Sequence, residues 1–179
     1  MSPASADPVI TEATPQERES LDSILTGSFT GLYLRHARRT LLEVETVRVA
    51  SIDGERVGLA MLKLLTKHAG YVYYIAVLPS FRMKGIGSSL LVDSLGHFAL
   101  AGATEVYASV GEDNVESKAL FMAQGFRRTD FGQVSKKYGT LHALSMYRSM
   151  LVVPGEMLLV KDTLTLPSTD LSAALDGAH

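Results

Sequence analysis

The hydrophobic positions near the N-terminus repeat at helical spacing. Thr14-Pro15-Gln16-Glu17 is typical of a helix start, with Thr at the N-cap, Pro in the first turn and Glu completing a capping box. Apolar residues then follow on one helical face, at Leu21, Ile24 and Leu25. A second helix is predicted from about Phe29 to Arg39. Residues 1–10 are rich in Ser, Pro and Ala, so we expect a flexible lead there.

Strand signals replace the helical spacing from Val44 onward. Apolar residues recur from Val44 to Ile52, and the Asp53-Gly54 pair that follows is a strong hairpin signal. Two further strands are predicted from Val57 to Leu65 and from Tyr71 to Leu78, both rich in residues that favour a pleated surface. Short connections predict that these three strands are antiparallel neighbours in one sheet.

A helix and a parallel strand are predicted next. Pro79 ends the preceding strand, and Gly85 opens a helix that runs to about Ala101 and ends at Gly102. The strand Glu105 to Val110 follows this helical crossover, so it should lie parallel to the strand Tyr71 to Leu78. A helix from about Val115 to Gln124 comes after it.

The C-terminal part is predicted to complete the sheet. Phe126 to Asp130 and Leu141 to Leu151 are interpreted as the final strands, with a polar loop from Gly132 to Gly139 between them. A further strand is expected at Met157 to Val160. The chain is therefore expected to form one domain over residues 11–153, with residues 154–179 adding a strand and a polar tail.

Composition narrows the class of protein. The 179 residues are 46% hydrophobic and 20% charged, with a net charge of -2, which is a globular balance and does not favour nucleic-acid binding. With no cysteine, disulfides and thiolate catalysis are excluded, and the five scattered histidines (positions 36, 68, 97, 142 and 179) predict no metal site. We expect no signal peptide, no membrane span and a cytoplasmic location.

The segment Arg82-Met83-Lys84-Gly85-Ile86-Gly87 carries the first chemical signal. It lies between a strand and a helix, where unpaired backbone N–H groups and the helix dipole favour an anion such as a pyrophosphate. Its glycines would let the backbone approach the ligand. A P-loop and a dinucleotide-binding GxGxxG motif are both absent from the sequence. Taken alone, the segment could also be a tight turn without a ligand.

Two blocks of sequence together resemble a known family. The run from Ile75 to Leu91 resembles the acyl-CoA-binding motif of the GNAT superfamily of N-acetyltransferases, with an apolar strand, V-x-P and [QR]-x-x-G-x-[GA]. Downstream, five positions follow the family's Asn…Leu-Tyr…Gly-Phe pattern, namely Asn114, Ala119, Leu120, Gly125 and Phe126. The resemblance covers about Tyr71 to Asp130.

This resemblance implies a fold and a set of cofactor contacts. The fold would be mixed α/β, with a mostly antiparallel sheet of six or seven strands, about four helices, and a splayed strand pair that binds CoA. The co-substrate would be acetyl-CoA, without a metal. The Val77 N–H would hold the thioester oxygen as it gains charge. The residues expected to bind the cofactor are Ile75, Ala76, Val77, Arg82, Met83, Lys84, Gly85, Ile86, Gly87, Ser88, Asn114 and Phe121.

The catalytic groups depart from the family pattern. Phe121 stands where many relatives carry a tyrosine that protonates the departing thiolate, so it would pack against the cofactor instead. The strand before the loop has no glutamate, which leaves Glu112 as a candidate base, beside Asp113 and a water chain, and places Tyr73 in the acceptor site. Glu112 and Asp113 could equally be a solvated pair at a helix entry. His142 and Tyr147 are further candidates.

The function expected is acetyl transfer to a primary amine of a small molecule or peptide. The alternatives are an acyl-CoA-binding regulatory module without turnover, and an interaction protein whose groove is vestigial. The sequence does not identify the acceptor. Its specificity would come from residues 15–39 and 132–139, where Arg35, Arg38 and Arg39 could favour an acidic acceptor. The strand predicted at Leu141 to Leu151 could pair across a homodimer.

Overall fold

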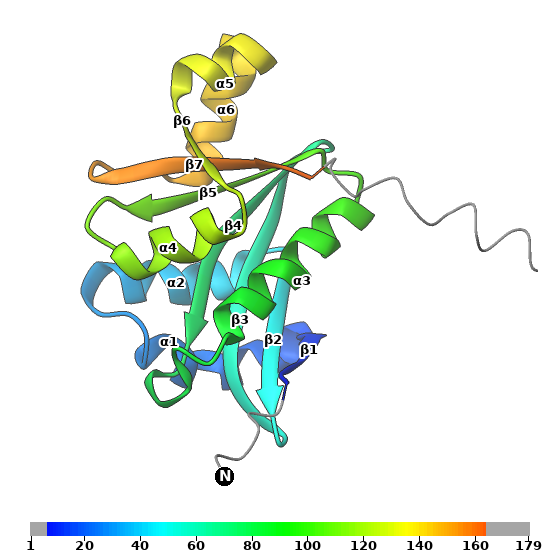
Figure 1. The fold of residues 1–179 in the computed structure, drawn as a ribbon, viewed down its shortest axis with the longest axis vertical. Helices are drawn as coiled ribbons and strands as arrows, with labels where there is room; N and C mark the ends of the chain where they lie inside the picture. The colour runs from blue at the N-terminus through cyan, green and yellow to red at the C-terminus, as the bar shows by residue number, and fades with distance from the viewer. Residues whose placement is uncertain (1–6, 164–179) are drawn as a thin grey trace, which may run out of the picture.

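A seven-stranded sheet organises residues 7–163, the part of the chain that the computed structural model describes. The strand order is β1-β2-β3-β4-β5-β7-β6, and every neighbouring pair is antiparallel except β4–β5, which is parallel as predicted. Figure 1 shows β4 and β5 near the centre of the molecule. The strands are β1 (Val9–Glu12), β2 (Thr46–Ile52), β3 (Glu55–Thr66), β4 (Ala69–Val77), β5 (Glu105–Gly111), β6 (Arg127–Thr129) and β7 (Glu156–Asp162).

Six α-helices and two 3₁₀ segments flank the sheet in the described residues, where about four helices were expected. None of the helices in this part of the chain has the length and apolar character that a bilayer crossing needs. The segments are η1 (Pro15–Leu21), α1 (Asp22–Thr26), α2 (Gly31–Glu43), η2 (Pro79–Phe81), α3 (Ile86–Leu100), α4 (Val115–Ala123), α5 (Phe131–Tyr138) and α6 (Thr140–Met150).

Alternation along the strands assigns the helices to two faces of the sheet. Val72 of β4 belongs to the apolar cluster beneath α3 and α4, whereas the adjacent Tyr71 belongs to the cluster with α5 and α6 on the opposite face. Leu59 of β3 packs in a third cluster, with α1 and α2. Successive strand residues point to opposite faces, so one apolar strand supports two helical layers.

Local turn signals predicted the strands β2, β3 and β4 correctly. Asp53 and Gly54 have φ angles of 50° and 81°, the left-handed values that a tight hairpin of this type requires, and they join β2 to β3. The strand predicted at Met157 to Val160 is also confirmed, as β7. The segment β1 was not predicted: Val9 and Ile10, assigned to a flexible lead, pair with β2.

Two predictions in the C-terminal part are wrong. The polar loop at Gly132 to Gly139 is helix α5, which begins where Asp130 Oδ1 accepts a hydrogen bond from the Gln133 N–H at 2.9 Å. The strand at Leu141 to Leu151 is helix α6, which buries one face through Ala143, Met146 and Met150. The strand that could have paired across a homodimer is therefore a helix.

A buried arginine fixes α2 against the rest of the fold. Arg18 of η1 donates from Nη1 to the carbonyl oxygens of Val44 at 2.6 Å and Leu41 at 3.2 Å. These carbonyls lie at the C-terminal end of α2, where helical backbone acceptors lack partners within the helix. The contact orients α2, which forms one wall of the site described next.

Candidate functional site

Strands β4 and β5 pair over a short stretch and then separate. The parallel register runs from Ala69 opposite Glu105 to Val72 opposite Ala108 and goes no further. On the other side of β4 the register with β3 shifts, because Leu62 lies opposite Val72 while Met61 lies opposite Tyr74. Tyr73 is therefore an extra residue on β4, a β-bulge that bends the strand where the separation begins. Figure 1 shows β4 running away from β5 beyond this point.

The separation leaves one backbone edge of β4 open. The Leu78 N–H donates to Val57 O of β3 at 2.9 Å. Because hydrogen-bonding directions alternate along an antiparallel ladder, the N–H groups of Ile75 and Val77 face away from β3, toward the side from which β5 has diverged. The Val77 carbonyl accepts from Arg82 Nε at 3.1 Å and from Ser28 Oγ at 3.3 Å. This edge offers backbone groups to a ligand.

A cavity of about 770 Å³ occupies the space between the separated strands. Its walls come from the α1–α2 connection and α2, from β4 and β5, from α4, and from the segment that joins α6 to β7. Four of the predicted site residues line it, namely Tyr73, Ile75, Asn114 and Phe121. The other predicted site residues, namely Ala76, Val77, Glu112 and the run Arg82 to Ser88, are not among its lining residues.

The start of α3 adjoins this cavity. The first helical hydrogen bond runs from Ser89 N to Gly85 O at 2.9 Å, so the N–H groups of Ile86, Gly87 and Ser88 have no partner within the helix. A Cβ on Gly87 would lie 3.5 Å from Leu120, which lines the cavity. The helix start can therefore hold an anionic part of a ligand whose remainder enters the cavity.

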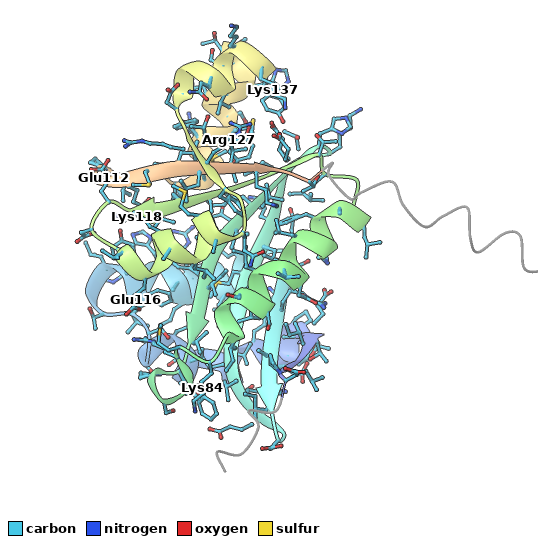
Figure 2. All side chains as sticks on the ribbon, in the orientation of Figure 1. Lys84, Glu112, Glu116, Lys118, Arg127 and Lys137 are labelled. Atoms are coloured by element: carbon cyan, nitrogen blue, oxygen red, sulfur yellow. The ribbon has the colours of Figure 1, made fainter. Side chains whose placement is uncertain are left out.

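The loop before α3 has the conformation that its glycine permits. Gly85 has φ of 81°, and Met83, with φ of 58°, is 94% exposed. Arg82 binds the Val77 carbonyl and reaches Gly27 O from Nη2 at 3.3 Å, so its contacts hold the loop against β4 and the α1–α2 connection. Lys84 remains at the surface, with Nζ 5.0 Å from the centre of the Phe81 ring (Figure 2).

Asn114 and Phe121 lie on the α4 wall. Asn114 Oδ1 accepts a hydrogen bond from the Ser117 N–H at 3.0 Å, so Asn114 is the N-cap of α4. Phe121 is 6% exposed and packs edge-to-face on Phe126, with ring centres 5.0 Å apart. The ring contributes an apolar surface to the cavity and no proton donor.

Glu112 lies outside the cavity. Its Oε1 accepts from Arg128 Nη2 at 3.2 Å, and its carbonyl accepts from Lys118 Nζ at 2.5 Å. Figure 2 shows Glu112 and Lys118 near each other at the surface, where β5 leads into α4. His142 and Tyr147, the other candidates, lie on α6 rather than on a strand, and neither lines the cavity.

Two carboxylates do line the cavity, those of Asp113, which was a candidate base beside Glu112, and of Glu156, which the sequence did not indicate. Tyr33 of α2 donates its hydroxyl to Glu156 Oε1 at 3.0 Å. Glu156 stands at the first position of β7, one residue before the predicted strand. Their convergence depends on the β5–β7 register, for which the sequence contains no local signal.

The tyrosines of the cavity are held in their protonated form. Burial, followed by the charge of Glu156, raises the pKa of Tyr74 to about 12. Burial is also the main cause that raises the pKa of Tyr73 and the pKa of Tyr33. The Tyr73 hydroxyl donates to the Ser149 carbonyl. At neutral pH these side chains can donate hydrogen bonds and present aromatic faces, but they do not act as bases.

The arginines expected to attract an acidic acceptor point elsewhere. Arg38 pairs with Asp22 at 2.6 Å and Arg39 with Glu43 at 3.0 Å, and neither lines the cavity. Arg35 is exposed and is also outside the lining.

Comparison with known sequences identifies similar proteins. A family model described as "Acetyltransferase (GNAT) family" matches residues 16–126. The chain is 33% identical over 85 residues to an L-2,4-diaminobutyric acid acetyltransferase of Nocardia farcinica, covering 46% of this chain and 44% of that one. It is 30% identical over 92 residues to an uncharacterized N-acetyltransferase of Archaeoglobus fulgidus, covering 48% and 63%. The matches thus span about half the length of these curated relatives.

Solved structures share the architecture. The PaiA N-acetyltransferase of Thermoplasma acidophilum, in complex with coenzyme A, superposes with a TM-score of 0.66 at 15% identity, covering 87% of this chain and 98% of that one. The IAA acetyltransferase of Bacillus cereus gives a TM-score of 0.64 at 21% identity, covering 87% and 99%. At these identities the similarity concerns the fold.

Proposed function

The chain belongs to the GNAT family of acetyltransferases, and on that premise we propose that it transfers the acetyl group of acetyl-CoA to a primary amine. The observation that carries this proposal is the parting of β4 and β5 after Val72 and Ala108, beside a cavity and an open strand edge. The relatives named as an L-2,4-diaminobutyric acid acetyltransferase and an uncharacterized N-acetyltransferase support the same reaction class. The acceptor is a small molecule or a peptide.

The residues present fit acetyl-CoA in two places. At the open edge of β4, the backbone groups of Ile75 and Val77 would pair with the amide-bearing arm, whereas those of Ala76 face β3. The α3 start from Met83 to Ser88 would hold the pyrophosphate. Arg82 would act by fixing this loop, since its guanidinium contacts backbone carbonyls. On the α4 wall, Asn114 would contact the arm and Phe121 would pack against it.

The reaction needs little beyond positioning. The amine nitrogen forms a bond to the thioester carbonyl carbon, the carbon–sulfur bond breaks, and the sulfur leaves with the electron pair. The Val77 N–H, which faces away from β3, would donate to the carbonyl oxygen as it gains charge. Phe121 supplies no proton, but a thiol with a pKa of about 8.5 leaves without strong acid assistance. The amine's proton passes to a base; Glu112 stays a prediction for that role, alongside ordered water.

A binding module without turnover is the second candidate. Phe121 in place of a hydroxyl donor and the outward position of Glu112 favour it. Release of free CoA thiol separates the two, because only an enzyme produces it when an amine is added. Acetyl-CoA binding with no amine-dependent thiol release would support the module.

The experiment starts with calorimetric titration of acetyl-CoA into the wild type and Gly87→Glu. Gly87 is the better site for the charge, since its Cβ would fit 3.5 Å from Leu120, whereas Gly85→Glu would also strain a residue at φ of 81°. A carboxylate there repels pyrophosphate, so we expect affinity to fall by about tenfold or more. Gly96→Glu is the matched control: it adds the same group to an exposed position on α3 with open space around it. Failure of the wild type to bind acetyl-CoA would refute the proposal.

A further inference from the structure

Resting on the proposed acetyl transfer, we infer that the acceptor is an amine that carries a second positive charge, and that Asp113 and Glu156 bind this second charge. The inference extends the proposed function from any primary amine to diamines and related dications. It depends on how the two carboxylates are placed in the cavity and on what surrounds them.

Both acidic residues lie at the end of the β5–β7 ladder, where Gly111 is the last residue of β5. Glu156 is the cross-strand partner of Gly111 in the β5–β7 ladder. Asp113 Oδ1 lies 3.0 Å from the position that a Cβ on Gly111 would occupy, so the Asp113 side chain folds back over this glycine. The missing side chain at Gly111 allows the Asp113 carboxylate to take this position, and both acidic residues line the cavity.

No opposing charge offsets these carboxylates within the cavity. Its lining, all of which belongs to the described residues, contains no lysine or arginine, and its one histidine, His36, is exposed on α2. The two carboxylates also affect a neighbouring phenol. After burial, the charges of Glu156 and Asp113 raise the pKa of Tyr33. An anionic acceptor would be repelled from this region, and a cationic one attracted.

The other lining groups suit an aliphatic cation. Tyr33, Tyr74 and Phe29 bring aromatic rings to the cavity, and the Phe29 and Tyr74 ring centres lie 5.3 Å apart. Aromatic faces attract ammonium groups, and they also pack against methylene chains. The carboxylates lie on the β5–β7 side and the open backbone edge on the β4 side, so a flexible diamine can reach both walls of the cavity.

The test measures binding separately from turnover. Putrescine, n-butylamine and γ-aminobutyrate share one carbon-chain length and differ only in the distal group, which is an ammonium, a methyl or a carboxylate. Each is titrated calorimetrically into the full chain saturated with CoA. We expect putrescine to bind roughly tenfold or more tightly than n-butylamine, since a charge-assisted hydrogen bond contributes about that factor. γ-Aminobutyrate should bind most weakly.

Variants assign the effect to the two carboxylates. Glu156→Gln and Asp113→Asn should each remove most of the preference for putrescine and leave n-butylamine binding nearly unchanged. Glu116→Gln is the matched control, because Glu116 is an exposed residue of α4 outside the cavity lining. The preference for putrescine should also weaken as salt is raised, since the site is open to solvent.

The outcomes of this test are distinct from those of the proposed function. Equal affinity for putrescine and n-butylamine, or tightest binding of γ-aminobutyrate, overturns the inference even if acetyl transfer occurs. Absence of binding by all three probes overturns it as well. Selective putrescine binding that Glu156→Gln abolishes upholds the inference, and thiol release from acetyl-CoA in the same samples then decides separately whether the bound amine is acetylated.

Discussion

The hydroxyl of Tyr33 and the carboxylate of Glu156, 123 residues apart in the sequence, form a hydrogen bond of 3.0 Å across the mouth of the cavity. Tyr33 belongs to α2 and Glu156 begins β7, so this hydrogen bond links two walls of the cavity. It also orients one of the two carboxylates that face the acceptor.

Tyr33→Phe should weaken acceptor binding without affecting acetyl-CoA. Tyr33 is 49% exposed, so the lost hydrogen bond is worth about 0.5–1.5 kcal/mol, which corresponds to a rise in the acceptor KM of roughly twofold to tenfold. Steady-state rates with an amine substrate give the KM, and calorimetry gives the acetyl-CoA affinity. Arg35→Gln, an exposed change on the same helix, is the control. An unchanged KM would show that Tyr33 does not orient Glu156.

Gly70→Ala should destabilise the sheet where β4 and β5 are still paired. A Cβ on Gly70 would lie 2.5 Å from the buried ring of Phe98, so that ring must move. Overpacking of this kind costs about 1–3 kcal/mol of unfolding free energy. Gly96→Ala, in an open exposed position of α3, should instead stabilise by about 0.5–1 kcal/mol. Urea unfolding of both variants measures the change in unfolding free energy, which should be a decrease for Gly70→Ala and an increase for Gly96→Ala.

The fold was predictable where the signals are local. The Asp53-Gly54 turn, the glycine before α3 and the helical crossover to β5 act within a few residues, and each was placed correctly. The prediction for the segment after Asp130 was wrong because Leu141 and Ala143 suggest strand alternation. In the structure Leu141 is exposed, and the buried positions of α6 follow helical spacing.

The acceptor side of the site could not be predicted for a different reason. Asp113, Glu156 and Tyr33 come together only through the β5–β7 register and the docking of α2. These are long-range relationships that no spacing in the sequence encodes. The strand, loop and helix proposed to hold the cofactor are continuous in the sequence, so a motif in the sequence could indicate them.

Asn114 can be tested for its two roles separately. Asn114→Ala removes the acceptor for the Ser117 N–H and should lower the unfolding free energy by about 1 kcal/mol. Asn114→Ser keeps a capping oxygen but has a shorter side chain, so stability should stay near that of the wild type. If Asn114 also contacts the CoA arm, Asn114→Ser should still weaken acetyl-CoA binding. Wild-type affinity in a stable Asn114→Ser protein would restrict the residue to capping.

The buried carboxylate of Glu105 should make stability depend on acid pH. Burial alone would raise the pKa of Glu105, but hydrogen bonds from Lys137, Tyr138 and Tyr107 outweigh it and hold the pKa below its ordinary value of 4.5. The hydrogen bonds from Tyr138 and Tyr107 measure 2.6 and 2.9 Å. A lowered folded-state pKa gives stability that is present above the unfolded-state pKa and is lost as the pH falls through the folded-state value.

Glu105→Gln should therefore reduce the unfolding free energy at neutral pH. The unfolding free energy of this variant should also fall less steeply than that of the wild type as the pH is lowered. Urea midpoints measured from neutral to strongly acid pH give both curves, which should approach each other as Glu105 of the wild type becomes protonated. Glu55→Gln, an exposed change in the hairpin, serves as the control and should follow the wild type throughout. Parallel curves for Glu105→Gln and the wild type would contradict the expectation.

Phe121→Tyr asks whether the missing hydroxyl limits the rate. The ring is 6% exposed and lines the cavity, so Phe121→Tyr adds a hydroxyl to a side chain of the cavity wall. A thiolate is a good leaving group, and we therefore expect kcat to change by less than about threefold. Phe121→Leu, which keeps an apolar side chain but loses the edge-to-face contact, should weaken acetyl-CoA binding instead. A tenfold or larger gain in kcat for Phe121→Tyr would show that protonation of the leaving sulfur limits turnover in the native chain.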